Sequence, residues 1–292
     1  MINFLKFKWL YFLISAIFIV PGIFSMLKWG FKPSIDFVGG TLLEIRLEKA
    51  LNNPDELIKY FEDQKTSIGS IQTSGQNTFL IKAKEFDKDT NGKIEEAISK
   101  SYGKIDELRF ETVGPVLGKE LLEKTLIGAI LAVIGILSYV AYSFKNIKFG
   151  ISAVLALFHD IIVVAGIFSL LGHFKGIEVD SLFVTAVLTT MSFSVHDTIV
   201  VFDRVRESVK KNPTLPFEIQ INKAITETMV RSLNNSLTII FMLTALFLLG
   251  GETVKWFVFA LLVGTVSGTY SSPFTATPIL YLLDKVEKRR KS

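Results

Sequence analysis

The sequence lacks cysteine altogether and contains only three histidines in 292 residues. Without thiols, the chain has neither a disulfide framework nor a thiolate metal site. Long stretches also lack charge, although 21% of all residues are charged and the mean hydropathy is +0.43. Such segregation is typical of a polytopic membrane protein, and it excludes a soluble enzyme, a DNA-binding domain or a disulfide scaffold as a description of the whole chain.

Six apolar segments are each long enough to cross the ~30 Å of bilayer hydrocarbon as a helix. Only two formally charged side chains fall inside them, Asp160 and Asp197. The first segment is longer than the apolar core of a signal peptide and no A-x-A-like site follows it, so we expect a retained span. The six segments are 9–27, 125–144, 149–171, 181–202, 232–251 and 256–283.

Lysine and arginine near the ends of the spans predict the orientation of the chain. Basic residues gather in the N-terminus, the 145–148 turn, the 203–231 segment and the C-terminal tail, whereas the opposite short loops carry only Lys175 and Lys255. We therefore expect the cytoplasm to contain both termini, a loop at 203–231 and the basic C-terminal tail. Residues 28–124 are expected on the opposite side of the membrane. This external segment is mildly acidic, so no nucleic-acid partner is expected.

An external domain is predicted at residues 30–124, between residues 1–29 with the first span and residues 125–292 with the other five. Its alternating patterns follow the order β-α-β-β-α-β of a ferredoxin-like fold. The fold class is thus six transmembrane helices plus a ferredoxin-like α+β domain between the first two. The domain has no histidine and no catalytic or metal-ligand spacing, which favours a binding or mechanical role. Expected strands are 41–48, 68–73, 78–84 and 108–113, and helices are expected after Asn53-Pro54 and over 92–102.

Ionisable residues inside spans indicate a functional site, because each costs ~2.5–3.5 kcal/mol or more to insert at mid-helix. Asp197 shares one helical stripe with Thr190 and Ser194, and Arg231 opens the following span. A carboxylate that an arginine alternately approaches and leaves will release and take up a proton, so the Asp197–Arg231 pair indicates a proton-coupled switch. Expected supporting polar residues are His159, Asp160, Thr190, Ser194, His196, Thr198 and Asn235.

Simpler structural roles remain open for several of these residues. Asp160 can be a buried structural carboxylate bonded to His159 and to helix hydroxyls. Arg231 can extend to the membrane interface. The serines and threonines of residues 265–272 can serve close helix packing alone, and His173 is expected to be incidental.

Five motifs resemble those of the SecF subunit family of the bacterial SecD–SecF protein-export complex, within the resistance–nodulation–division superfamily. The first, Asp36-Phe37-Val38-Gly39-Gly40, is similar to the family's D-F-x-G-G motif outside span one. The sequence departs from the family at His196, where an Asn is usual, at Ser192, where a Gly is usual, and at Pro273 and Pro278. The other motifs are Val113-Gly114-Pro115 with Gly118, Glu120 and Leu121; His159-Asp160; Ser192 through Glu207; and Gly268 through Ser272.

The resemblance implies a translocase subunit that uses the proton-motive force to help move polypeptides through the SecYEG channel, and no enzyme. It implies Asp197 as the proton-relay aspartate, Arg231 as its partner, and Asp36, Phe37, Gly39 and Gly40 as the motif at the base of the external domain. Expected partners are SecD, the SecYEG channel, translocating polypeptides, YajC and the lipid bilayer of the inner membrane. No cofactor or metal is expected beyond the coupling ion, H⁺ or Na⁺. The alternatives are a proton-driven small-molecule or lipid exporter and a non-transporting scaffold for SecD.

Overall fold

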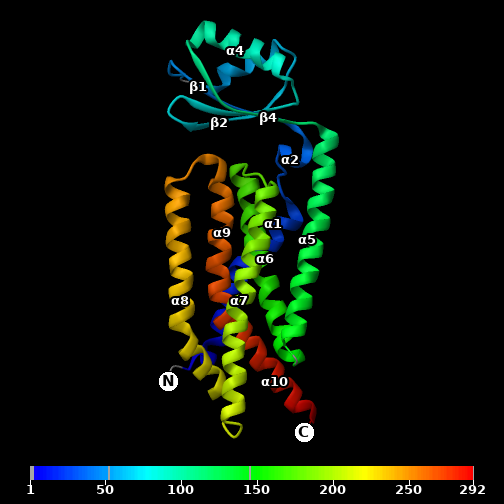
Figure 1. The fold of residues 1–292 in the computed structure, drawn as a ribbon, viewed down its shortest axis with the longest axis vertical. Coiled ribbons are helices and arrows are strands. Elements are labelled where there is room, and N and C mark those ends of the chain that lie inside the picture. The colour runs from blue at the N-terminus through cyan, green and yellow to red at the C-terminus, as the bar shows by residue number, and fades with distance from the viewer. Residues whose placement is uncertain (1–2, 52, 145, 292) are drawn as a thin grey trace. The chain divides into compact units, whose positions relative to one another are not determined.

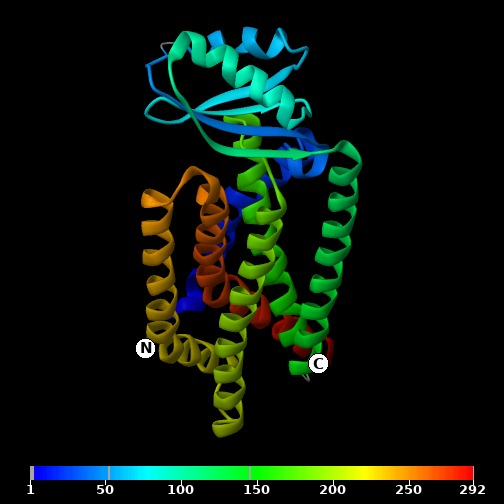
Figure 2. The same cartoon turned by 45° about the horizontal axis from the view of Figure 1, so that its top comes forward.

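The computed structural model describes residues 3–51, 53–144 and 146–291 of the chain. It divides into two compact units, one formed by Met1–Lys32 with Gly128–Ser292 and the other by Pro33–Ile127. Each unit is described separately below (Figures 1 and 2).

The larger unit is a bundle of helices that correspond to the six predicted spans, although α5 up to Ile127 belongs to the smaller unit. Within the described residues, six helices are long and apolar enough to cross a membrane. The last one is interrupted by a π-helical turn, η3, that contains Pro273. The helices are α1 (Lys8–Lys28, after the short turn η1, Phe4–Phe7), α5 (Pro115–Ser143), α6 (Ile147–Lys175), α7 (Ser181–Lys211), α8 (Phe217–Leu249), α9 (Glu252–Ser271), η3 (Ser272–Ala276) and α10 (Thr277–Lys291).

The segment 203–231, predicted as a cytoplasmic loop, is mostly helical. Helix α7 continues to Lys211 and α8 begins at Phe217, which leaves only residues 212–216 as a connection. Charged pairs along the surface support the extension, including Lys211 Nζ at 2.6 Å from Glu207 Oε1. Hydropathy measures the apolar length of a helix and not its full length, so the sequence underestimated α7.

The helices of the bundle pack mainly around α6 and α9. Helix α9 packs against α6, α7 and α8, and α1 packs against α6. Helices α5 and α8 lie at opposite sides of this unit in both views (Figures 1 and 2). Only 6% of the most apolar window of α5 is buried, so α5 presents nearly all of its apolar surface outward. The core at one end holds Phe149, Leu157 and Phe202.

The smaller unit is a four-stranded antiparallel sheet in the order β2-β3-β1-β4. This is the arrangement of a ferredoxin-like fold and confirms the predicted fold class. Helices α3 and α4 bury Phe61, Ile94 and Ile98 with the strand residues Ile45 and Ile81. The elements are α2 (Ile35–Val38), β1 (Gly40–Leu47), η2 (Pro54–Leu57), α3 (Ile58–Glu62), β2 (Ile68–Gly75), β3 (Thr78–Ala83), α4 (Lys88–Tyr102) and β4 (Ile105–Val113).

Helix α4 begins four residues before the predicted start at Gly92. Asp87 caps it, because its Oδ1 accepts a hydrogen bond of 2.9 Å from the backbone N–H of Thr90. A hydrogen bond from the Thr90 side chain, and next this backbone hydrogen bond, hold the pKa of the Asp87 carboxyl below its usual value. The apolar stripe begins later than the helix because its first turn is polar and exposed, so periodicity alone missed the start.

Candidate functional site

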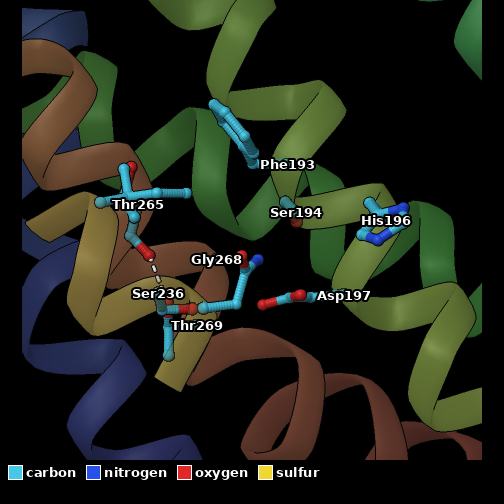
Figure 3. Close-up of a pocket in the computed structure, with 10 residues that line it drawn as sticks. Phe193, Ser194, His196, Asp197, Ser236, Thr265, Gly268 and Thr269 are labelled. Atoms are coloured by element: carbon cyan, nitrogen blue, oxygen red, sulfur yellow. Dashed lines mark hydrogen bonds between the residues drawn. The ribbon is translucent and has the colours of Figure 1, made fainter. Parts of the chain in front are cut away.

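Helix α7 carries the predicted polar stripe toward α8 and α9. Thr190 and Ser194 are buried and Asp197 is half-buried, all on the same side of the helix. Figure 3 shows Asp197 pointing toward the helices that carry Ser236 and Thr269. The stripe therefore faces the interior of the bundle and not the surrounding lipid.

A small cavity lies beside Asp197, with a volume of about 20 Å³. This is the space that one water molecule needs, and the walls are polar enough to bind one. Three helices contribute to the cavity, so its size depends on how α7, α8 and α9 pack. Its lining consists of Phe193, Ser194, His196, Asp197, Asn235, Ser236, Ile239, Thr265, Gly268 and Thr269.

Asp197 contacts α8 through a hydroxyl. Ser232 Oγ donates to Asp197 Oδ2 at 3.1 Å. Arg231, the next residue in sequence, is exposed. Among the described residues, no ion pair within 4.0 Å joins Arg231 to Asp197. The predicted partners therefore lie on facing segments of α7 and α8, with the serine hydroxyl making the direct contact.

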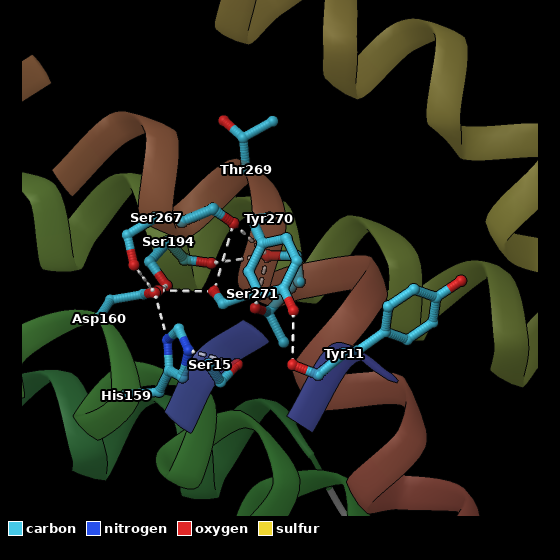
Figure 4. A network of polar contacts seen from close by, with 12 residues as sticks. Tyr11, Ser15, His159, Asp160, Ser194, Ser267, Thr269, Tyr270 and Ser271 are labelled. Carbon is cyan, nitrogen blue, oxygen red and sulfur yellow. Dashed lines mark hydrogen bonds and ion pairs between the residues drawn. The ribbon is translucent and has the colours of Figure 1, made fainter. Parts of the chain in front are cut away.

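Asp160 lies at the centre of a second, fully buried cluster (Figure 4). Its Oδ2 accepts from Ser194 Oγ at 2.5 Å and from Ser271 Oγ at 2.6 Å. Its Oδ1 accepts from Ser267 Oγ at 2.6 Å and lies 3.0 Å from His159 Nδ1. Short hydroxyl–carboxylate bonds of this kind are charge-assisted and strong, and they join α6 to both α7 and α9.

His159 extends the cluster to the first helix. Its Nε2 lies 2.9 Å from Ser15 Oγ on α1. Farther along α7, the Thr198 and Ser272 hydroxyls lie 2.9 Å apart. Ser194 links the two groups of residues, because it donates to Asp160 and also lines the cavity beside Asp197.

The other predicted polar residues divide by position. His196 and Asn235 line the cavity and are otherwise exposed. Thr190 donates to Val187 O at 2.9 Å within its own helix. The sequence did not single out Ser15, Ser232 or Ser236 as site residues. Ser267 and Ser271 were noted only as packing residues, although their four-residue spacing places both on one helical face.

The motif residues Asp36, Phe37, Gly39 and Gly40 form a tight turn between α2 and β1. Gly39 has a φ of +80° and lies against the start of α5, where an added Cβ would be 2.8 Å from Pro115 Cα. Gly118 packs in return against the backbone N of Gly39, where its own Cβ would lie at 2.9 Å. This contact fixes the first turn of α5 to the end of α2.

No group of three or more His, Asp or Glu side chains suited to a metal ion occurs within residues 3–51, 53–144 and 146–291. The oxygen atoms around Asp197 and Asp160 instead form hydrogen-bonded clusters. Such clusters can hold and pass protons along hydroxyls and water.

Comparison with known families decides the identity. Residues 93–286 match the family described as Protein export membrane protein SecD/SecF, C-terminal, and residues 24–50 match the SecD/SecF GG Motif. A protein translocase subunit SecF from Thermobaculum terrenum is 40% identical and aligns with 96% of this chain and 93% of its own length. This chain belongs to the SecF family. A SecF subunit from Anaerolinea thermophila is 37% identical, over 99% of this chain and 96% of its own.

Solved structures agree with this membership. The crystal structure of SecDF, a translocon-associated membrane protein from Thermus thermophilus, matches with a TM-score of 0.86 and 30% identity over 97% of this chain. SecDF in a super-membrane-facing form matches with a TM-score of 0.68 and 28% identity. This chain spans only 39% and 40% of those two chains. The predicted SecF resemblance is confirmed, and the chain is a multi-pass membrane protein with a role in protein translocation.

Proposed function

We propose that this chain couples the proton-motive force to the late stages of protein translocation through the SecYEG channel. The observation that carries the proposal is the place of Asp197, a carboxylate inside a span, beside a cavity of about 20 Å³. Hydroxyls and an amide from three helices line this cavity, and such groups can pass a proton to the carboxylate beside them. H⁺ is the proposed coupling ion, with Na⁺ as the tested alternative.

The energy for movement comes from the charge that Asp197 gains and loses. An ionised carboxylate prefers polar partners, whereas the protonated form tolerates an apolar contact at much lower cost. Each proton that crosses the membrane releases ~2.3 kcal/mol per 100 mV. Arg231 lies on the segment of α8 that faces Asp197, so a shift of α8 changes the charge that Asp197 meets.

SecD is the proposed partner that completes the unit. The solved SecDF chain contains a counterpart of this chain in only 39% of its length, which supports SecD as the partner that supplies the remainder. The external domain would brace or bind the emerging polypeptide, and the turn at Asp36–Gly40 would pass movement to it through the contact between Gly39 and Pro115. YajC is a further proposed partner. Both termini are proposed to lie on the cytoplasmic side of the inner membrane, as the basic residues indicate.

Replacement of Asp197 by Asn tests the coupling role. Inverted membrane vesicles that carry Asp197→Asn should lose the part of preprotein translocation that depends on a proton gradient, and keep the part that does not. Asp203→Asn is the matched control, because Asp203 lies on the same helix, is exposed and pairs with Arg206 at 3.2 Å. The control should retain gradient dependence.

Ionophores then separate the ions. A proton ionophore should abolish the stimulation in wild-type vesicles, and a sodium ionophore should not. Full gradient-dependent translocation with Asp197→Asn would contradict the proposal and favour a scaffold role. Stimulation that follows the sodium gradient would retain the site and change the ion.

A further inference from the structure

Three adjacent cavities lie at the end of the bundle where α5 ends and α6 begins. The first has a volume of about 350 Å³ and runs between α5 and α6, with an uncharged lining that includes Leu137, Val140 and Leu155. Since Leu155 lies eight residues beyond Ile147, this apolar groove follows α6 for about 12 Å. Helix α5, which forms one wall of the groove, presents nearly all of its apolar surface outward.

The second and third cavities continue this groove into a polar pocket. The second, about 610 Å³, shares Ile147 and Ile151 with the apolar groove and shares Asn146 and Lys148 with the third. The third, about 530 Å³, also shares Phe144 with the groove. The shared residues place the three cavities next to one another, from apolar helix surface to charged side chains at the helix ends.

The third cavity, here called the basic pocket, is lined by four cationic side chains. They come from elements far apart in the sequence: Lys148 on α6, Arg206 and Lys210 on α7, and Lys288 on α10. Asp284 is the carboxylate in the lining. Arg206 and Lys210 are spaced by four residues, so they lie on one face of α7.

Carboxylates around the basic pocket neutralise only part of this charge. Asp284 lies 2.7 Å from Lys148 and 2.9 Å from Lys288, so a single carboxylate serves two cations. Glu287 also pairs with Lys148, at 2.8 Å. Arg206 pairs with Asp203 through an exposed contact.

Lys210 provides the remaining positive charge. It is exposed and forms no ion pair with any carboxylate in the described part of the chain. The four cations of the basic pocket meet three carboxylates, Asp203, Asp284 and Glu287, so the pocket keeps a net positive charge.

We propose that the basic pocket binds the phosphate of an anionic phospholipid, with an acyl chain lying in the apolar groove between α5 and α6. The charge matches the head group, and the adjoining groove matches its acyl chain. A free phosphate would use only the first of these, whereas a phospholipid uses both. In the proposed orientation this end faces the cytoplasmic leaflet, where anionic lipids concentrate and each nearby Lys or Arg contributes ~1 kcal/mol.

Binding is measured on the purified full chain in mild detergent, with phosphatidylglycerol, phosphatidylethanolamine and inorganic phosphate as separate probes. Phosphatidylglycerol should raise the melting temperature and remain bound in native mass spectrometry, at lower concentration than phosphatidylethanolamine. The double variant Arg206→Gln with Lys210→Gln should bind phosphatidylglycerol about 25-fold more weakly. Lys175→Gln, at the far end of α6, is the matched control and should bind as the wild type does.

Ile151→Trp tests the groove without altering any charge. It should weaken phosphatidylglycerol binding while the melting temperature in lipid-free detergent shows that the variant is folded. Equal binding of both lipids by the wild type would overturn the proposal. So would a double variant that binds as tightly as Lys175→Gln, or inorganic phosphate that binds as well as the lipid. None of these measurements depends on proton coupling, so the lipid site can be refuted without refuting the proposed function, and the reverse.

Discussion

Gly166 provides the sharpest test of how the bundle is held together, because α6 and α1 meet there with backbone against backbone. A Cβ added at Gly166 would lie 2.5 Å from the Cα of Gly22, and one added at Gly22 would lie 3.0 Å from the Cα of Gly166. Carbon atoms in contact rest at ~3.5–4.0 Å. Gly166→Ala must therefore separate the two helices by ~1 Å, since no side chain can rotate away.

The cost of this separation follows from the neighbouring contacts. Ser25 and Ser169 join the same two helices through a hydroxyl contact of 2.7 Å, about one turn from the glycines. A shift of ~1 Å stretches it beyond hydrogen-bond range. Losing an interhelical hydrogen bond in a membrane costs ~0.6–1.7 kcal/mol, and overpacking costs ~1–3 kcal/mol. The expected destabilisation is about 2–4 kcal/mol.

Thermal unfolding of the purified chain in mild detergent measures this effect. A loss of that size should lower the melting temperature by about 5–15 °C. Gly135→Ala is the matched control, because it places the same methyl group on α5 where no atom lies within 4 Å. Melting of Gly166→Ala within ~1 °C of the Gly135→Ala control would refute the close approach of α1 and α6.

Two further predictions concern the smaller unit and the Asp160 cluster. Burial raises the pKa of Glu95, and the nearby Glu107 raises it further. Because the pKa of Glu95 is raised in the folded state, its ionisation destabilises the fold as pH rises. Glutamine cannot ionise, so Glu95→Gln should slow hydrogen exchange in α4 at pH 7. The difference between variant and wild type should vanish below ~pH 4, where Glu95 is protonated. Ser267→Ala removes a 2.6 Å bond to Asp160 and should destabilise the bundle by ~1–2 kcal/mol in detergent. Ser192→Ala, which loses only an exposed bond to its own helix, should show no comparable change.

The elements that the sequence predicted are those with local patterns. Six apolar segments with only two charged side chains among them marked the spans, because a span must satisfy its backbone internally and charge is costly there. Alternation marked β1 and β4, and β-rich runs on either side of a hairpin signal marked β2 and β3; all four strands occur in the antiparallel sheet. The stripe of Thr190, Ser194 and Asp197 was visible as well, because helical spacing alone places these residues on one face.

Contacts between helices were beyond the reach of such patterns. Ser15 and His159 are 144 positions apart in the chain, and only packing of α1 against α6 brings them together. The spacing of Ser267 and Ser271 showed that they share a polar face of the helix, but it did not show that this face contacts Asp160. Since serine also serves close packing in membranes, composition could not separate the two roles. The full length of α7 was missed for a different reason, because its last turns are held by surface charges.

The two intramembrane carboxylates differ in what their surroundings permit. Asp160 is 3% exposed and accepts hydroxyls from α7 and α9 at 2.5–2.6 Å, so moving it would break several strong bonds at once. Asp197 is half-buried, faces a cavity and contacts α8 through Ser232. Our proposal therefore assigns Asp160 to hold α6, α7 and α9 as one body. Asp197 then responds to the proton at the contact with α8, whose most apolar window is only 11% buried. On this view, α8 is the helix that shifts when Asp197 changes charge.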